Sequence, residues 1–367
     1  MSHKLSSKFM PQNYQVLAEN IKSRINPDHI ALQRSFSAEL ATISYSDVLV
    51  YVRLAMKGVD EDYTRRTKDA GERVKDHLRA SLTNVIFRYQ GSVMTNTHIR
   101  AHSDIDLLTI TNKFYTYDAY SAKKMLNEQA NSLTYSQRQK LTNEVNVTGY
   151  SGSLLDDLRS LRLDCENILS SKYSVCDIEH AKAIKITNLS LGRDVDIVIA
   201  NHYDDVVSII NDKGDYRGIQ VYNKETHSRG DVDYPFMSIE KINARGIETV
   251  GRIKKMIRFL KNVKAKSNSD IRLSSFDFNA ICYDINVDKY KYLSFYELVP
   301  VLYQQIKSLC DNQWHSDSLM SVDGREAIFK GHPDKLRHLR LILNEVTSIY
   351  SDMIDARIFG KTLVQMI

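Results

Sequence analysis

Residues 85–111 read VIFRYQGSVMTNTHIRAHSDIDLLTIT and contain two β-rich runs joined by a mostly polar segment. The first run ends in Gly91-Ser92, and the second opens with Asp104-Ile105-Asp106. Because successive side chains on a strand point to opposite faces, Asp104 and Asp106 are expected to project side by side. Two adjacent carboxylates repel each other unless a cation lies between them, and Mg²⁺ prefers carboxylate oxygens together with substrate phosphates. Glycine lets the backbone approach a phosphate closely and serine offers a hydroxyl and an N–H, so the segment predicts a phosphate site facing a metal site.

A third carboxylate is expected, because a two-metal transfer site needs one more acidic ligand near the nucleophile. Asp196 is the favoured candidate, since it interrupts the apolar run 195–198, where a charge is costly unless it is paired or bound to a metal. Asp194 shares its strand face but stands at the start of the strand, and it remains the alternative. Asp231 and Asp233 flank a predicted turn and are expected to be exposed to solvent.

The composition is ordinary for a soluble globular chain. The 367 residues are 43% hydrophobic and 26% charged, and Lys and Arg exceed Asp and Glu by 50 to 45. This mild basic excess suits an anionic ligand such as a nucleoside triphosphate and does not require nucleic acid. The four cysteines form no CxxC pair, which favours reduced thiols. The N-terminal residues lack an apolar signal core and no apolar run is long enough to span a membrane, so we expect a cytoplasmic protein without a membrane partner.

Apolar periodicity predicts a central β-rich part between two helical parts. A long helical pattern over residues 45–80 leads directly into the first β-rich run, and paired strands are expected over 183–200 and 218–234. A loop is expected at tyrosines 115–120. Further helices are predicted over residues 135–145, 153–171, 239–266, 275–284, 293–311 and 333–357.

The Gly-Ser followed at this interval by Asp-x-Asp resembles the signature of the nucleotidyltransferase superfamily built on the DNA polymerase β palm. Gly91, Ser92, Asp104 and Asp106 stand at the matching positions. The resemblance implies an α+β fold, a polymerase-β-like palm with a mixed sheet, a long N-terminal helix and a helical C-terminal lobe.

The layout over residues 45–285 further resembles the cGAS/DncV-like family of bacterial cyclic-oligonucleotide synthases. The segment ending at Lys261 is similar to a family helix whose terminal lysine grips the donor triphosphate. The segment 273–276 is similar to the one that follows, in which a serine contacts phosphate and an aromatic ring stacks on the base. The resemblance therefore implies nucleotide contacts for Lys261, Ser275 and Phe276. A solvated helix face for Lys261 and a core position for Phe276 are the alternatives.

Within this resemblance two domains are expected: 1–238 as the nucleotidyltransferase core with the N-terminal helices and the catalytic sheet, and 239–367 as a helical lobe that completes the nucleotide cleft. Asp104, Asp106 and Asp196 would hold two Mg²⁺ ions, with Mn²⁺ as a substitute. Asp196 would orient the attacking hydroxyl or accept its proton, and Ser92 would hold the β and γ phosphates.

The family implies an enzyme that joins nucleoside triphosphates into a cyclic di- or trinucleotide second messenger for antiphage (CBASS) signalling, with release of pyrophosphate. ATP, with GTP, CTP or UTP as further substrates, and an effector reached through the cyclic product are the implied partners. A regulatory protein encoded with the enzyme is also compatible with the family, and no stable nucleic-acid partner is expected.

Two other functions remain open from the residues. One keeps the chemistry and changes the acceptor, as in a template-independent polymerase or an RNA or small-molecule nucleotidyltransferase. The other is a catalytically inactive nucleotide sensor. His98 and His102 have metal-ligand spacing for a helix, but they fall in a predicted loop and give only a weak zinc signal. The bases joined, the linkage, the ring size, the activating signal and the oligomeric state do not follow from the sequence.

Overall fold

The computed structural model describes residues 13–23, 46–99, 105–356 and 358. Contacts divide the chain into two compact units. The sheet unit comprises Asp60–Asn96 and Ser103–Asn243. The helical unit comprises Met1–Val59, Thr97–His102 and Ala244–Ile367.

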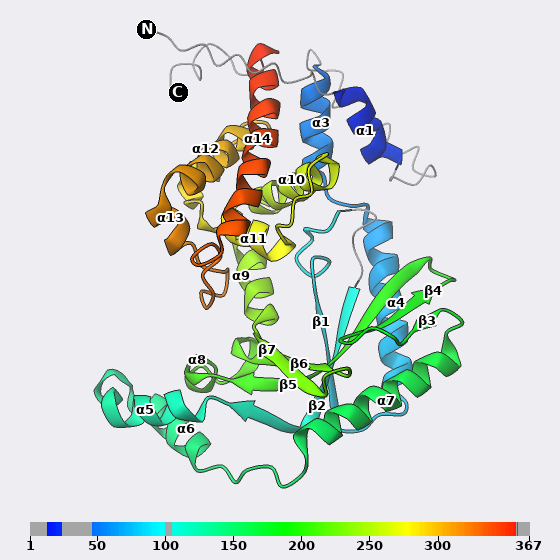
Figure 1. Ribbon diagram of the computed structural model, residues 1–367, viewed down its shortest axis with the longest axis vertical. Helices are drawn as coiled ribbons and strands as arrows, with labels where there is room; N and C mark the ends of the chain where they lie inside the picture. The colour runs from blue at the N-terminus through cyan, green and yellow to red at the C-terminus, as the bar shows by residue number, and fades with distance from the viewer. Residues whose placement is uncertain (1–12, 24–45, 100–104, 357, 359–367) are drawn as a thin grey trace. The chain divides into compact units, whose positions relative to one another are not determined.

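A mixed sheet forms the centre of the sheet unit, as Figure 1 shows, and it has seven strands. Its strand order is β1-β2-β5-β4-β3, and β6 pairs with both β5 and β7. The two long central strands β2 and β5 are parallel, whereas the other pairs are antiparallel. The strands are β1 Val85–Gln90, β2 Ile105–Tyr117, β3 Cys176–Asp177, β4 Ile184–Asn188, β5 Arg193–Asp204, β6 Gly218–Asn223 and β7 Ser228–Asp233.

Alternating side chains of β2 and β5 enter two different apolar layers. Leu107, Val195 and Ile197 pack with the helices α4 (Glu61–Arg79) and α7 (Leu154–Lys172) on one face. The opposite face carries Leu108, Val198, Ala200 and, from the start of α9, Phe236. Strands that are buried on both faces read as nearly continuous apolar runs, which explains the sequences LLTI and IVIA.

The other helices of the sheet unit lie in the connections between its strands. They are α5 Ala119–Glu128, α6 Tyr135–Val145, α8 Val206–Ile210 and the short 3₁₀ turns Ala130–Ser132 and Gly214–Tyr216. Tyr115 and Tyr117 lie in β2 and Tyr120 lies in α5, so the loop expected at tyrosines 115–120 is wrong; only Asp118 separates the strand from the helix. Asp118 caps α5 by accepting a hydrogen bond from the backbone N–H of Ser121.

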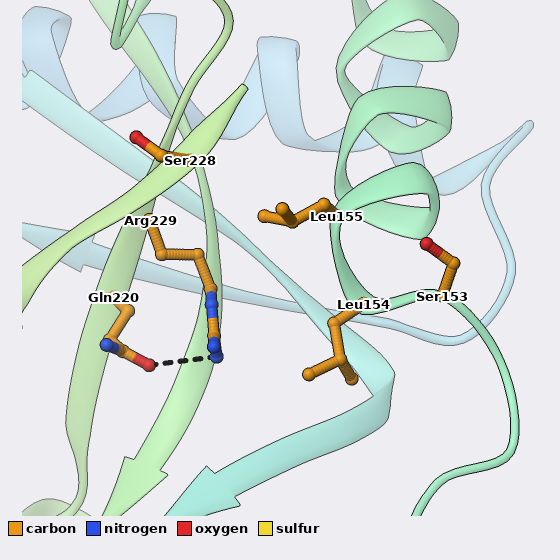
Figure 2. Close-up of a pocket in the computed structure, with 6 residues that line it drawn as sticks. All are labelled: Ser153, Leu154, Leu155, Gln220, Ser228 and Arg229. Carbon is orange, nitrogen blue, oxygen red and sulfur yellow. Dashed lines mark hydrogen bonds between the residues drawn. The ribbon is translucent and has the colours of Figure 1, made fainter. Parts of the chain in front are cut away.

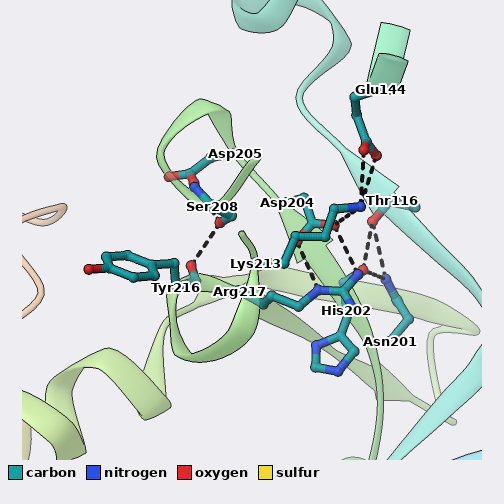
Figure 3. A network of polar contacts seen from close by, with 10 residues as sticks. All are labelled: Thr116, Glu144, Asn201, His202, Asp204, Asp205, Ser208, Lys213, Tyr216 and Arg217. Carbon is teal, nitrogen blue, oxygen red and sulfur yellow. Dashed lines mark hydrogen bonds and ion pairs between the residues drawn. The ribbon is translucent and has the colours of Figure 1, made fainter. Parts of the chain in front are cut away.

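A buried ion-pair network fixes the end of β5, as Figure 3 shows. The fully buried Asp204 carboxylate accepts hydrogen bonds of 2.9 Å from both Nε and Nη2 of Arg217. Lys213 lies 3.2 Å from Asp204 and 3.0 Å from Glu144 of α6. A buried carboxylate is tolerated when charged donors surround it. Because Lys213 contacts both Asp204 of β5 and Glu144 of α6, the network also ties α6 to the sheet. Burial, with the Arg217 charge, lowers the pKa of the neighbouring His202 to about 3 and keeps that ring neutral.

Over its described residues, the helical unit consists mainly of α-helices. Its helices are α1 Tyr14–Ser23, α3 Asp47–Met56, the last part of α9 Pro235–Glu248, α10 Arg252–Lys266, α11 Ser275–Asp284, α12 Leu298–Asp311, α13 Gln313–Ser318 and α14 Pro333–Asp355, with a 3₁₀ turn at Val287–Lys289. No helix in the described part of the chain combines the length and the apolar character needed to cross a membrane.

The N-terminal helices group with the helical unit by their contacts, whereas the sequence-based division placed them with the sheet in residues 1–238. The reason is packing at the end of α3. Arg258 Nε donates to the carbonyl oxygen of Met56, and Asn262 Nδ2 donates to that of Ala55, each at 2.9 Å. These side chains of α10 satisfy carbonyls that the end of a helix leaves without an intrahelical partner. The other boundary, Asn243/Ala244, lies close to the predicted one.

Candidate functional site

The turn after β1 brings backbone close to a carboxylate. Gly91 has a φ of +90°, a conformation that favours glycine. A Cβ atom built on Gly91 would lie 2.9 Å from Oδ2 of Asp106. A side chain at position 91 would therefore displace the Asp106 carboxylate or the turn. Ser92 follows in the same turn, half-buried, and its carbonyl oxygen accepts a 3.2 Å hydrogen bond from Thr95 Oγ1.

Next to this turn, a row of four polar side chains crosses the sheet. Asp106 of β2 lies opposite Gln90 of β1 and opposite Asp196 of β5, and Asp196 in turn lies opposite Lys185 of β4. Directly opposed residues on neighbouring strands project from the same face. Gln90, Asp106, Asp196 and Lys185 therefore share one face, the one that carries Leu108 and Val198 deeper in the sheet. Two carboxylates that are about 90 positions apart in the sequence are thus neighbours.

Asp196 is more enclosed than Asp194 and has a cationic neighbour. Its side chain is 16% exposed, and its Oδ2 lies 3.4 Å from Nζ of Lys185. Asp194 is exposed and accepts a 2.6 Å hydrogen bond from Thr187 Oγ1 of the adjacent strand. The sequence left open which of these two carboxylates is the third ligand. In the structure, Asp196 is the one that lies opposite Asp106 in the strand register.

The donor set suits a hard divalent cation. Asp106 and Asp196 offer carboxylate oxygens on neighbouring strands, and the glycine turn leaves room beside Asp106 that a Cβ would fill. The predicted third ligand, Asp104, lies outside the described residues. Among residues that are described, no group of three or more His, Cys, Asp or Glu side chains could hold a metal ion. His98 is buried in the helical unit, and its predicted partner His102 is not described.

The predicted nucleotide-contact residues of the helical unit lie on α10 and α11. Lys261 is only 7% exposed, and burial, with the nearby Arg258 charge, lowers the pKa of its ammonium to about 8. Ser275 is exposed and Phe276 is half-buried in the first turn of α11. The side chain that caps this helix is Ser274, which forms a capping box with Asp277. Lys261, Ser275 and Phe276 belong to the helical unit, whereas Asp106 and Asp196 belong to the sheet unit.

A separate open cavity has a volume of about 480 Å³. Its lining residues come from the start of α7 and from the β6–β7 hairpin, as Figure 2 shows. Arg229 lines it and donates a 3.1 Å hydrogen bond to Gln220. Gln220 lies opposite Asn201, an odd-numbered residue of β5. The cavity is therefore on the α7 side of the sheet, whereas Asp106 and Asp196 project from the other side.

Sequence reasoning missed Gln90 and Lys185, although both belong to strands that it predicted. The signal was alternation: Lys185 lies between Ile184 and Ile186, so it projects away from the apolar layer beneath them. Its position beside Asp196 depends on the strand register, which spacing in the sequence does not give.

A mixed sheet that presents two carboxylates beside a glycine turn is the arrangement expected of a nucleotidyltransferase palm. The model of the cGAS/DncV-like nucleotidyltransferase C-terminal helical domain matches residues 240–351. The chain is 50% identical over 345 residues to a c-di-GMP synthase of Capnocytophaga granulosa, covering 93% of this chain and 98% of that protein. It is 41% identical over 344 residues to a c-di-GMP synthase of a Lachnospiraceae bacterium, covering 93% and 99%.

Solved structures agree with these relatives. A STING-associated CdnE c-di-GMP synthase from Flavobacteriaceae sp. superposes with a TM-score of 0.84 at 38% identity, covering 93% of this chain and 98% of that one. The corresponding structure from Capnocytophaga granulosa gives a TM-score of 0.77 at 45% identity, covering 94% and 100%. The chain belongs to the cGAS/DncV-like nucleotidyltransferase family. The predicted fold and the predicted enzyme class, a nucleotidyltransferase that makes a cyclic nucleotide from nucleoside triphosphates, are confirmed.

Proposed function

We propose that this enzyme joins two molecules of GTP into cyclic di-GMP and releases pyrophosphate. The proposal of GTP is supported by relatives at 50% and 41% identity that are c-di-GMP synthases and match over almost their whole length. The observation that carries the chemistry is the register pairing of Asp106 with Asp196 beside the Gly91 turn. Attack on an α-phosphate needs such a concentration of carboxylates, because the nucleophile must be oriented and the cations that neutralise phosphate must be held.

Each predicted site residue of the sheet unit has a role in this proposal. Asp106 and Asp196, with Asp104, would hold Mg²⁺. When bound, this ion would neutralise the phosphate oxygens and favour the deprotonated form of the attacking hydroxyl. Asp196 orients that hydroxyl or accepts its proton. The Gly91 backbone and the Ser92 hydroxyl bind the β and γ phosphates, since the turn keeps side-chain bulk away from them.

The helical unit contributes Lys261, Ser275 and Phe276 in the same proposal. Within the described residues, Lys261 forms no hydrogen bond or ion pair, although its side chain is almost fully buried. A buried ammonium is costly unless an anion compensates its charge, and a triphosphate would do so. Ser275 would donate to phosphate, and the half-buried Phe276 ring would stack on the base.

The product would act through a receptor. Two of the structural relatives are STING-associated synthases, so we infer an effector with a STING-type domain as the reader of the cyclic product in antiphage signalling. The enzyme would work in the cytoplasm, where its nucleotide substrates are available.

Incubation of the purified enzyme with all four nucleoside triphosphates and Mg²⁺, followed by mass determination, tests the proposal. We expect a phosphatase-resistant product with the mass of cyclic di-GMP, formed equally well from GTP alone. A ladder of linear products would indicate a polymerase. Binding of GTP without release of pyrophosphate would indicate an inactive sensor, and a cyclic product with other bases would overturn the assignment of GTP.

A further inference from the structure

Lys185 is the residue next to Asp196 on the side away from Asp106. Its ammonium lies 3.4 Å from Oδ2 of Asp196, within ion-pairing distance. The lysine side chain is 44% exposed, whereas that of Asp196 is 16% exposed. The charge therefore approaches a largely enclosed carboxylate from the solvent side.

The strand register makes this contact a fixed feature of the fold. Ile184 pairs with Ile197 and Ile186 pairs with Val195, and all four side chains are buried in the layer under α4 and α7. A shift of β4 by one residue would expose both isoleucines and bury Lys185, at a large cost in free energy. The apolar pairs thus hold the ammonium opposite Asp196.

A cation held at this carboxylate opposes a second cation there. A unit charge and a divalent ion several ångströms apart repel each other by on the order of 1 kcal/mol at a solvent-exposed site. Nucleotide binding offsets this repulsion, because a triphosphate brings negative charge and additional oxygen ligands to the same place.

We propose that Lys185 is the counter-cation of Asp196 in the metal-free enzyme and weakens the binding of divalent metal at this carboxylate until a triphosphate is present. The inference rests on the proposed function, since it takes Asp196 as a metal ligand. Lys185 acts through Asp196 and is therefore a positioning residue. Because metal binding is weak without a triphosphate, metal and nucleotide are bound together, and the enzyme with metal but without nucleotide is rare.

Binding of Mn²⁺ to the full chain, measured from the electron paramagnetic resonance signal of the free ion, tests this inference with and without α,β-methylene-GTP. Lys185→Gln removes the charge and Lys185→Arg retains it. Lys182→Gln is the matched control, because Lys182 is exposed three residues earlier and its removal changes the net charge equally. Without nucleotide, we expect Lys185→Gln to bind Mn²⁺ roughly tenfold more tightly than the wild type, and both other variants to remain within about twofold.

The sign of the effect distinguishes the two roles of a lysine at this position. A lysine that only supports the shape of the site would leave Mn²⁺ binding unchanged or weakened when removed, and either result would overturn the inference. In an Asp196→Asn background, Lys185→Gln should lose its effect, because the two changes act on one interaction. Failure of the wild type to form cyclic di-GMP would refute the proposed function instead, and the product assay reads that independently of Mn²⁺ binding.

Discussion

Asp194 and Asp196 lie two positions apart on β5, yet their surroundings give them different expected roles. Asp196 is enclosed and opposite Asp106, whereas Asp194 is exposed and bound by the Thr187 hydroxyl. Removing the negative charge of a metal ligand weakens both metal binding and charge stabilisation in the transition state. A solvated carboxylate at the end of a strand contributes little to either.

We therefore expect Asp196→Asn to lower kcat by about a hundredfold or more, and Asp194→Asn to leave it within about threefold of the wild type. Rates of pyrophosphate release from GTP measure both, and thermal unfolding checks that each variant folds. Asp106→Asn should behave as Asp196→Asn does. Comparable losses for Asp194→Asn and Asp196→Asn would show that the register pairing does not select the ligand.

Lys261 is expected to cost stability when no nucleotide is bound. Burial lowers the pKa of its ammonium from an ordinary value near 10.5 to about 8. Below pH 8 the buried group is charged and its full cost applies. Between pH 8 and 10.5 the unfolded chain binds more protons than the folded one, so the free energy of unfolding rises with pH in this window.

Lys261→Met should accordingly be more stable than the wild type at pH 7, by up to about 3 kcal/mol, and the difference should shrink as pH rises towards 10.5. Urea unfolding without nucleotide at pH 7 and pH 10 measures this. Lys289→Met, at an exposed position of the same unit, should change stability little at either pH. A Lys261→Met variant that is less stable at pH 7 would mean that the ammonium makes net favourable contacts in the fold.

At the scale of elements, the predicted helix 239–266 is two helices, α9 and α10. The interruption is a Schellman motif: the N–H of Gly251 donates to the carbonyl of Gly246 at 2.7 Å, and that of Val250 donates to Ile247 at 3.2 Å. Val250 occupies the left-handed position of this motif with a φ of +49°. A β-branched residue is strained there. Because Val250 is 74% exposed, it buries little apolar surface that could offset the strain.

We expect Val250→Gly to raise the free energy of unfolding by about 0.5–1 kcal/mol, because relief of left-handed strain exceeds the added entropy of glycine in the unfolded chain. Chemical denaturation measures the change. Ile247→Ala is the matched control, since Ile247 is 82% exposed in a regular helical turn and its truncation should have little effect. A destabilised Val250→Gly variant would indicate that the valine side chain makes contacts worth more than the strain.

Local patterns predicted the elements better than their interruptions. The helices expected over 135–145 and 275–284 agree with α6 and α11, because each begins at a capping serine or threonine that the sequence displays. The single helix expected over 45–80 is instead α3 and α4, separated around Asp60, which caps α4. An acidic cap within a continuous polar and apolar pattern is easily read as a surface position of one long helix.

In the candidate site, too, the local features could be predicted from the sequence, whereas the contacts between strands could not. Gly91 and Asp106 could be predicted because the chemistry of the turn and the strand period are local. The choice of Asp196 rested on a charge in an apolar run, but its place beside Asp106 and Lys185 depends on parallel and antiparallel register across three strands. Register is set by the packing of apolar residues over the whole sheet, which a single sequence does not reveal.

At the scale of the whole molecule, the chain order does not follow the division into units. Seven of the ten residues of α3 are buried, and α1 contributes a hydrogen bond from the Tyr14 hydroxyl to Asp352 of α14. Fully burying an apolar side chain contributes about 1.5–3 kcal/mol, so loss of α3 removes an amount comparable to the whole stability of a typical domain. The C-terminal helices are therefore expected to depend on residues that precede the catalytic sheet.

A chain of residues 239–367 alone should fail to fold cooperatively, because Arg258 and Asn262 lose the carbonyl acceptors of α3 and the apolar face of α10 loses its cover. Residues 46–59 joined by a flexible linker to 244–358 should restore a cooperative thermal transition, measured by helical circular dichroism. The same linked chain with Val52→Asp is the control, since Val52 is fully buried in α3 and a charge there should abolish the rescue. If 239–367 unfolds cooperatively by itself, the N-terminal helices are an accessory to the helical unit and the two-domain division expected from the sequence describes the folding units better.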